Sequence, residues 1–287
     1  MVIKADHFPA PGETIMGGEF FMFPGGKGAN QAVAAARLGG NVTFIAKVGN
    51  DIFGEHTLQK FREEKINTQF IISDKENPSG VALITVDKKG ENTIVVAPGS
   101  NGTLSPIDIL NADKEFEQAD IVLMQLEIPL NTVQHAAKHA NYYHKKIILN
   151  PAPARQLPDE LLDGLFILTP NESEAEILLG VKISNIKSVE AAAKKLYEKG
   201  VVNVVVTLGA EGAYIYNADG GRLIPTSKVK PVDTTAAGDV FSGALAVAIS
   251  EDKTLDEAVA FANQAASISV TKMGAQSSAP YRKELND

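Results

Sequence analysis

Residues 232–250 have the sequence VDTTAAGDVFSGALAVAIS, in which a polar run is followed by small residues and then by a helical pattern. Ala236, Ala237 and Gly238 stand directly before Asp239, and apolar residues then recur at helical spacing. Small residues at the start of a helix leave backbone N–H groups free. These groups and the positive end of the helix dipole favour an anion such as phosphate. The stretch therefore predicts an anion site beside a carboxylate, as phosphoryl transfer needs, although a capped core helix explains it equally well.

The composition excludes several functional classes. The chain has 287 residues, 22% of them charged, and its net charge of −8 argues against a nucleic-acid or anionic-membrane surface. It contains no cysteine, which rules out disulfides, thiol catalysis and zinc sites built on cysteine. No apolar run approaches the ~20 residues of a membrane span, and the amino terminus does not have the form of a signal peptide. We therefore expect a cytoplasmic protein.

A second glycine-rich loop lies at residues 24–31, with the sequence PGGKGANQ. It runs into an alanine-rich helical segment at 32–38 that ends at Gly39. It is not a Walker A loop, because Lys27 is followed by Gly28 rather than by Ser or Thr. The loop is typical of close backbone approach to a ligand, but a tight loop that packs a small-residue helix on a sheet is equally compatible with it.

Regular alternation of strands and helices predicts the fold class. Strands are expected at 42–48, 120–124, 146–149, 165–168 and 202–207, and helices at 53–64, 105–112, 129–140, 171–179, 187–198 and 255–272. Such repeated units indicate an α/β fold with a mostly parallel, Rossmann-like central sheet and helices on both faces. In sheets of this kind, ligands bind beyond the carboxyl ends of the strands.

A smaller set of antiparallel strands is predicted apart from this sheet. Residues 80–86 and 91–97 are joined by a turn containing Gly90, and a glycine-broken strand is expected at 14–23. We interpret this set as a β lid formed by about residues 10–24 and 80–97. No linker, internal repeat or low-complexity tract divides the sequence, so we expect a single domain over 1–287.

Polar residues follow the predicted strands where these end. Glu127 follows the strand at 120–124, and Asn171 and Glu174 follow the strand at 165–168. Each has an ordinary structural explanation, because Asn171 and Glu174 match a helix cap and a capping box, and Glu127 could face solvent. The turn at 209–212 could likewise be a simple hairpin. The coincidence of these features at strand ends indicates a binding site.

Three segments resemble a known family. GGKGANQ at 25–31, NPAPA at 150–154 and DTTAAGD at 233–239 are similar to motifs of the ribokinase branch of the ribokinase-like (phosphofructokinase B type) sugar kinases. The resemblance covers essentially the whole chain and implies the ribokinase-like α/β fold. It also implies ATP-dependent phosphorylation of D-ribose at the 5-hydroxyl. The alternatives are another sugar or nucleoside kinase of the same family, or a non-catalytic sugar- or nucleotide-binding relic.

The resemblance also implies roles for individual residues. Asp239 would take the proton from the sugar hydroxyl, while the segment of Ala236, Ala237 and Gly238 would stabilise the transferring phosphoryl group through its N–H groups. The residues implied to contact the sugar are Gly26, Lys27, Gly28, Asn30, Glu127 and Asp239. Those implied to bind ATP are Asn171, Thr207, Leu208, Gly209, Ala210, Glu211, Gly212, Gly238 and Asn263.

Two cations are implied in the same way. Glu174 would act on Mg²⁺ through water, in line with that ion's tendency to keep its waters. Potassium would shape the anion site without touching the substrate. Its implied oxygen ligands, several of them backbone carbonyls, come from Asp233, Thr235, Ser269, Lys272, Gly274 and Ser278.

The expected partners are the small-molecule sugar, ATP and a second copy of the chain bound through the β lid, with no nucleic acid or membrane. One feature departs from the family pattern. The family begins with a strand carrying an Asn-x-Asp motif that grips the sugar, and this motif would fall immediately upstream of Met1. We therefore expect Met1 to be an internal methionine of a longer natural chain.

Overall fold

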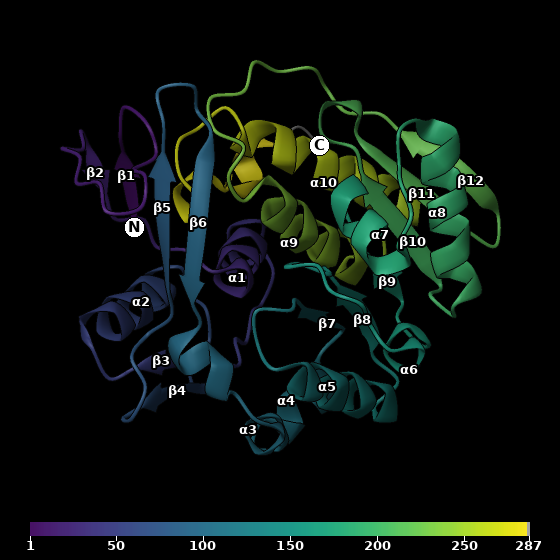
Figure 1. The fold of residues 1–287 in the computed structure, drawn as a ribbon. Coiled ribbons are helices and arrows are strands. Elements are labelled where there is room, and N and C mark those ends of the chain that lie inside the picture. Colours follow the sequence, from purple (N-terminus) through teal and green to yellow (C-terminus); the bar gives the residue numbers. More distant parts are fainter. Residues whose placement is uncertain (286–287) are drawn as a thin grey trace.

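The computed structural model describes residues 1–285, and its largest sheet has six strands (Figure 1). These are β7 Ile121–Met124, β8 Lys146–Leu149, β9 Ile167–Leu168, β10 Asn203–Thr207, β11 Ala213–Asn217 and β12 Gly220–Ile224, in the order β12-β11-β10-β9-β8-β7. The strands from β7 to β10 are parallel, whereas β11 and β12 add as antiparallel neighbours. The predicted α/β fold is confirmed, with the strand expected at 165–168 confined to its last two residues.

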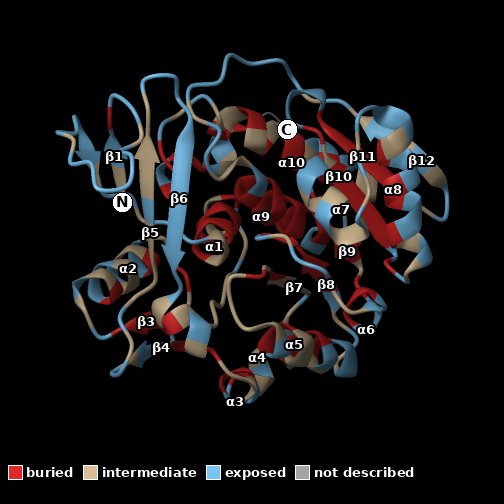
Figure 2. Cartoon of the chain, viewed as in Figure 1, coloured by how far each residue is buried: buried red, intermediate tan, exposed pale blue. Residues whose placement is uncertain are grey.

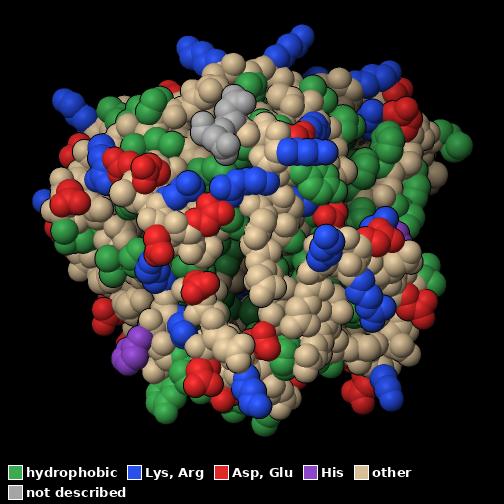
Figure 3. Space-filling view, turned by 180° about the vertical axis from the view of Figure 1, so that it is seen from behind, with side chains coloured by type: hydrophobic (Ala, Val, Ile, Leu, Met, Phe, Trp, Pro, Cys, Tyr) green, Lys and Arg blue, Asp and Glu red, His purple; other side chains and the backbone are tan. Residues whose placement is uncertain are grey.

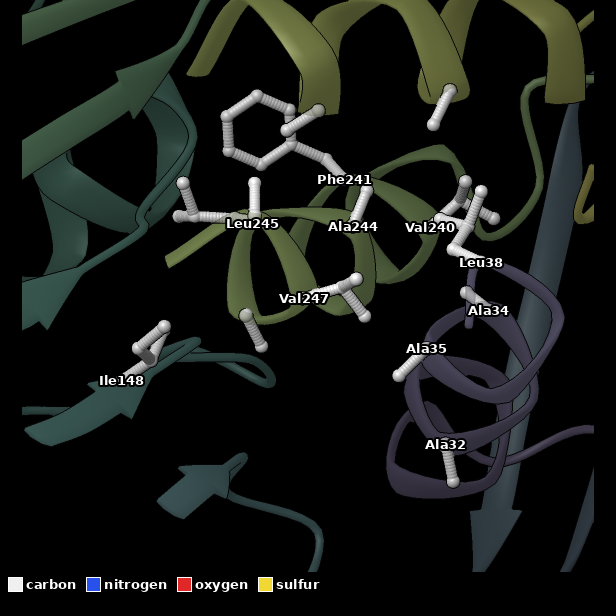
Figure 4. Close-up of a cluster of buried hydrophobic side chains, with 14 of the residues drawn as sticks. Ala32, Ala34, Ala35, Leu38, Ile148, Val240, Phe241, Ala244, Leu245 and Val247 are labelled. Atoms are coloured by element: carbon white, nitrogen blue, oxygen red, sulfur yellow. The ribbon is translucent and has the colours of Figure 1, made fainter. Parts of the chain in front are cut away.

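One face of this sheet packs on α1 (Lys27–Arg37), α9 (Ala237–Ser250) and α10 (Leu255–Ser269). Successive side chains of a strand point to opposite faces, so only alternate strand residues, such as Ile148 and Val205, enter this core. Figure 4 shows α9 between Ile148 on one side and α1 on the other. The helix is therefore apolar nearly all round and is among the most deeply buried elements (Figure 2).

The opposite face packs on α5 (Leu130–Tyr142) and α8 (Ile186–Glu198). The neighbouring strand residues Ile147, Val204 and Val206 are fully buried here. Helices thus cover both faces of the sheet, as the alternating pattern predicts.

The remaining helices are α2 Ile52–Glu63, α3 Pro106–Leu110, α4 Asp113–Gln118, α6 Asp159–Leu162 and α7 Glu172–Leu179, with 3₁₀ turns η1 Gly99–Thr103, η2 Gly209–Glu211, η3 Gln276–Ser278 and η4 Arg282–Glu284. The sequence predicts α2, α3 and α7 but misses α4 and α6, because such short helices contain too few turns to show a period. Over residues 1–285, no helix combines the length and the apolar character needed to cross a membrane.

A separate two-stranded sheet contains β3 (Ala46–Gly49) and β4 (Ile71–Asp74), which are parallel. No strand within residues 1–285 pairs with both β3 and β7, so β7 is an edge strand of the six-stranded sheet. The parallel strands that were expected in one central sheet therefore lie in two separate sheets.

The third sheet, which we call the lid sheet, has the order β2-β1-β5-β6, with β1 Val2–Lys4, β2 Phe20–Phe21, β5 Val81–Val86 and β6 Asn92–Ala97. β5 and β6 form the predicted antiparallel hairpin. The strand expected at 14–23 is reduced to β2, because Gly17 and Gly18 offer no side chains to pack. β1 joins this sheet as a parallel neighbour of β5.

β5 follows a region that we call the lid base, which comprises Asp51, Gly54, Asp74 and residues 76–80. Asp51 accepts hydrogen bonds from the N–H of Gly54 at 2.9 Å and from the N–H and the hydroxyl of Ser79, both at 2.7 Å. Burial alone would raise the pKa of Asp51, but these donors outweigh it and hold the pKa below its ordinary value. The carboxylate therefore ties the start of α2 to the residue two positions before β5.

Asp74 holds the other end of the β5–β6 hairpin in the same way. Its carboxylate accepts hydrogen bonds from the N–H of Glu76 at 2.9 Å, the N–H of Asn77 at 3.0 Å and the hydroxyl of Thr103 at 2.8 Å. These donors, that of Glu76 foremost, hold the pKa of Asp74 well below its usual range. Because Thr103 ends η1, which follows β6, both connections of the hairpin are fixed to the body of the molecule.

Candidate active site

Helix α9 begins with a turn that leaves backbone donors unpaired. Ala236, the residue before the helix, has φ 61° in the left-handed region, and no side chain caps the helix. Within residues 1–285, the N–H groups of Gly238 and Asp239 have no hydrogen-bond partner. The N–H of Ala237 is bonded to the carbonyl of Thr234 at 3.3 Å. The free donors expected at this helix start are thus present at Gly238 and Asp239.

The start of α9 borders a cavity of about 160 Å³. The cavity is lined by Lys27, Asn150, Ala152, Thr169, Asn171, Glu174, Thr207, Thr234, Ala236, Ala237, Gly238 and Asp239. Asn150 and Thr169 directly follow β8 and β9, and Thr207 ends β10, so the cavity lies at the carboxyl ends of parallel strands. A Cβ added at Gly238 would meet no atom within 4 Å, so the space beside this glycine is open.

Asp239 is buried in this cavity, with 5% of its surface exposed. Asn30 donates to its Oδ2 at 2.8 Å, and Gln31 donates to its Oδ1 at 3.1 Å. Burial raises the pKa of Asp239, while the charge of Lys27 and the two amide donors act in the opposite direction. The result is a carboxylate that is more basic than usual but is held in place by donors that favour its ionised form.

The start of α1 forms a second wall. Gly26 precedes the helix with φ 93°, a conformation that favours glycine, and the N–H of Lys27 donates to Glu127 Oε2 at 2.7 Å. Glu127 therefore does not simply face solvent, and burial raises the pKa of its carboxyl group. Of the residues implied to contact the sugar, Lys27 and Asp239 line the cavity, whereas Gly26, Gly28, Asn30 and Glu127 do not. The last four lie in or against the first turn of α1.

The start of α7 forms a third wall. Asn171 accepts a hydrogen bond from the N–H of Glu174, and Glu174 accepts one from the N–H of Asn171, both at 2.8 Å. The capping-box interpretation is thus confirmed, and both side chains also line the cavity. Burial raises the pKa of Glu174, the charge of Asp239 raises it further, and the Asn171 N–H and Lys27 oppose the rise. A desolvated carboxylate in this position is suited to accepting a hydrated cation.

The turn implied to bind ATP lies only partly at the cavity. Thr207 lines it, whereas residues 208–212 form the connection between β10 and β11, which pair as the hairpin alternative predicts. Asn263 is buried, and its side-chain amide donates to the carbonyl of Ile224 at 3.0 Å instead of lining the cavity. ATP contacts of residues 208–212 and Asn263 therefore stay predictions.

Some of the residues implied to hold potassium gather around Asp233. Its carboxylate accepts hydrogen bonds from the N–H groups of Thr235 and Gly274, both at 2.9 Å. Burial alone would raise the pKa of Asp233, but hydrogen bonds from Thr235 and Gly274 hold it below its ordinary value. This carboxylate is thus ionised beside the loop that follows α10, where Gly274 lies.

The other residues implied to hold potassium could bind it only through carbonyl or hydroxyl oxygen atoms. The Lys272 ammonium group pairs with Glu284 at 2.6 Å, and the hydroxyls of Ser269 and Ser278 donate to backbone carbonyls at 2.8 Å. Residues 1–285 contain no group of three or more acidic or histidine side chains that could hold a metal ion. A cation here would therefore depend on carbonyl, hydroxyl and single carboxylate oxygens, a donor set that suits a hard cation.

Sequence reasoning missed several buried amides next to Asp239. Gln31 and Asn150 are 1% and 6% exposed, and Gln31 bonds both Asp239 and Asn150. Gln125, which follows β7, donates to Gln31. Their positions after predicted strands and inside the glycine-rich segment were the available signal, but the partners are about a hundred or more positions apart in the chain.

Comparisons with known proteins agree on one family. The chain matches the pfkB family carbohydrate kinase over residues 1–282. It is 46% identical to a ribokinase of Haemophilus influenzae over 99% of this chain and 92% of the relative. The crystal structure of a ribokinase from Thermotoga maritima is 44% identical with a TM-score of 0.90, over 99% of this chain and 93% of that one. A structure of Arabidopsis thaliana ribokinase complexed with ribose and ATP is 31% identical with a TM-score of 0.91, over 98% and 92% of the two chains. The chain therefore belongs to the pfkB family of carbohydrate kinases.

Proposed function

We propose that the protein transfers the γ-phosphoryl group of ATP to the 5-hydroxyl of D-ribose, giving ribose 5-phosphate and ADP. The observation that carries this proposal is the pairing of buried Asp239 with the free N–H groups at the start of α9. The relatives and structural neighbours named as ribokinases support ribose as the sugar and ATP as the donor.

Asp239 acts as the base in this reaction. Its carboxylate takes the proton of the 5-hydroxyl as the sugar oxygen forms a bond to the γ-phosphorus and the bond from that phosphorus to the β-phosphate oxygen breaks. The N–H groups of Gly238 and Asp239, with Lys27 nearby, stabilise negative charge on the transferring group. ADP leaves with the electron pair of the broken bond.

The sugar binds next to the start of α1. Asn30 is 6% exposed, and its Oδ1 has no hydrogen-bond partner within residues 1–285, while its Nδ2 is bound to Asp239. An unpaired buried acceptor is costly, and a sugar hydroxyl would supply the missing donor. Lys27 and Glu127 offer a donor and an acceptor near Asn30, and Gly26 and Gly28 are proposed to contact the sugar as well.

ATP and its cations would bind on the side of α7 and of the start of α9, partly beyond the residues that line the cavity. Asn171, the segment 207–212, Gly238 and Asn263 would bind the nucleotide, and Glu174 would act through water on Mg²⁺. Potassium would be held by oxygens of Asp233, Thr235, Ser269, Lys272, Gly274 and Ser278. When bound, these ions neutralise negative charge on the phosphates and shape the anion site.

The lid sheet is proposed to join two copies of the chain. Ile3, Phe20, Leu83 and Val95 lie on one face of it, because Phe20 pairs with Ile3 and Val95 with Leu83, and all four are exposed. Contiguous exposed apolar side chains mark an interaction surface. Sedimentation should detect a dimer that Leu83→Glu converts to a monomer, and a monomeric native protein would contradict this assembly.

Small molecules are proposed as the only other partners, in the cytoplasm. Acidic and basic side chains are interspersed on the face drawn in Figure 3, and the net charge is −8, which fits neither a nucleic-acid nor an anionic-membrane surface. Fractionation of the source cells tests the location, since recovery with the membrane fraction would contradict it.

A coupled assay of ADP release tests the proposed reaction. With ATP and Mg²⁺, D-ribose should be turned over faster than 2-deoxy-D-ribose, D-fructose or adenosine, and ³¹P NMR of the product should show the 5-phosphate. Asp239→Asn is the control that separates enzyme turnover from contaminating kinases. If another sugar is turned over faster, that sugar and not ribose is the substrate. Release of ADP without formation of a sugar phosphate would contradict sugar phosphorylation.

A further inference from the structure

Three side-chain amides form a chain beside Asp239, with Gln31 and Asn150 buried and Gln125 half-buried. Gln31 of α1 donates through Nε2 to Asp239 Oδ1 and to Asn150 Oδ1, each at 3.1 Å. Gln125 donates to Gln31 Oε1, and Asn150 donates through Nδ2 to the carbonyl of Thr169 at 3.1 Å. The chain of amides thus connects α1 and α9 to the ends of β7, β8 and β9.

The carbonyl of Thr169 sets the direction of every bond in this chain. A carbonyl oxygen only accepts, so Asn150 turns its NH₂ group to Thr169 and its oxygen to Gln31. Gln31 must then turn its own NH₂ group toward Asn150, which also directs that group to Asp239. The bond from Gln125 to Gln31 Oε1 supports the same orientation. Gln31 therefore has one orientation that satisfies all of its partners.

Close packing of α1 against α9 brings Gln31 to Asp239. A Cβ added at Gly243, one turn after Asp239, would lie 2.6 Å from the carbonyl oxygen of Gln31 and 3.0 Å from Ala34 Cβ. Only glycine permits this approach of the two helices. The fit leaves Gln31 just 1% exposed, so water has little access to replace its bond to Asp239.

We propose that Gln31 is a positioning residue for phosphoryl transfer, an inference that rests on the proposed role of Asp239 as the base. Asn30 holds Oδ2 and Gln31 holds Oδ1, so the carboxylate is bound through both oxygens and its plane is fixed. Both donors favour the ionised carboxylate, the form that can accept a proton. Orientation matters because a displacement of ~1 Å at a reacting group can lower a rate about 100-fold.

Other charged groups also act on Asp239. Lys27, at the start of α1, favours the ionised carboxylate, whereas Glu127 after β7 and Glu174 on α7 carry like charges. Burial raises the pKa of Asp239, and the Gln31 bond is one of the interactions that limit the rise. Removing the Gln31 donor therefore leaves Asp239 protonated over a wider range of acidic pH.

Gln31→Met is the direct test, because methionine keeps the length and volume of the side chain but removes both donors. We expect kcat with ribose and ATP to fall about 10- to 100-fold. The acid limb of the kcat–pH profile should move to higher pH, and KM for ATP should stay within about threefold. The matched control is Asn203→Leu, which removes another buried amide, bonded to Phe166 at the other end of β10. It should lower Tm without moving the acid limb.

Gln31→Glu is a second, nearly isosteric variant that remains informative if Gln31→Met fails to fold. It places a second carboxyl group beside Asp239, so the acid limb should move upward further. An acid limb at the native position in either folded variant would overturn the positioning role and leave Gln31 a packing residue. Asp239→Asn separates the two proposals, because retained turnover in that variant contradicts the role of Asp239 itself.

Discussion

The cavity and the lid base both contain carboxylates that are at least partly buried, but the pKa values of these carboxylates are shifted in opposite directions. In the lid base, Asp51 and Asp74 each accept three or more hydrogen bonds, two of them from backbone N–H groups, and their pKa values are lowered. At the cavity, burial outweighs the hydrogen-bond donors and raises the pKa values of Asp239 and Glu174, and it also raises the pKa of Glu127 beside the start of α1.

The difference follows from what each region must do. A carboxylate saturated with donors fixes backbone segments and has little tendency to take up a proton. A desolvated carboxylate with few donors makes the folded protein less stable than it could be, but it remains able to bind a proton, a hydroxyl or a hydrated cation. Three carboxyl groups with raised pKa values therefore lie near the unpaired N–H donors, and this distinguishes the reactive region at the cavity from the structural lid base.

Matched substitutions of the two aspartates should show the largest contrast. Asp239→Asn should lower kcat by at least about 1,000-fold while ATP still binds, because the amide cannot accept the proton. Asp51→Asn should keep kcat within about threefold, since Asp51 lies outside the cavity and the amide oxygen still accepts a bond at the start of α2. Steady-state kinetics and calorimetric ATP binding measure both effects, and comparable losses in the two variants would contradict the distinction.

Glycine-to-alanine substitutions should lower the free energy of unfolding in the lid base but not at the cavity. A Cβ at Gly54 would overlap the carbonyl oxygen of Gly49, so Gly54→Ala should lower the free energy of unfolding by about 2–3 kcal/mol. A Cβ at Gly238 would meet nothing within 4 Å, so Gly238→Ala should be neutral or stabilise by up to about 1 kcal/mol. The same methyl group should lower turnover, because it enters the cavity beside the free N–H groups. Urea unfolding with parallel assays tests this contrast, and equal destabilisation would argue against an open helix start.

Asp51 and Asp239 should change the pH dependence of the free energy of unfolding with opposite signs. This effect should be smaller than those of the substitutions above. The lowered pKa of Asp51 contributes stability above the unfolded value of about 3.9, and this contribution is lost as pH falls through the folded value. Asp51→Ala should therefore cost about 1–2 kcal/mol at pH 7 and progressively less below pH ~4. The raised pKa of Asp239 has the opposite sign, so the stability of Asp239→Asn relative to the native protein should increase as pH rises from about 4. Chemical unfolding at several pH values measures both effects. The same sign of pH dependence for the two variants would contradict the prediction.

Sequence patterns predicted much of the reactive region because its signals are local. The free helix start at Ala236–Gly238 and the capping box of Asn171 and Glu174 each lie within a few residues of the chain. Strand ends could be placed from short apolar runs, and parallel topology then brings them together at one edge. Several residues implied to contact the ligands do not line the cavity, namely Gly26, Gly28, Asn30 and Glu127 for the sugar and residues 208–212 and Asn263 for ATP.

The lid base and the amide chain could not be predicted for the opposite reason. Asp51 and Ser79 are 28 positions apart, and Gln31 and Asn150 are 119 apart, with no periodic pattern that pairs them. Asp51 looks like an ordinary helix cap until the tertiary fold brings Ser79 to its second oxygen. The division of the parallel strands into two sheets depends on backbone pairing, which apolar runs do not specify.

The pKa of Asp239 shows whether the cavity prepares this carboxylate to act as a base. Carboxyl ¹³C signals of protein labelled at aspartate can be followed from pH 3 to 8, with Asp239→Asn and Asp51→Asn identifying the two resonances. We predict a titration midpoint for Asp239 above the ordinary value of about 3.9 and one for Asp51 below it. A midpoint for Asp239 at or below that of Asp51 would contradict its role as the base, because burial would then not have raised its affinity for a proton.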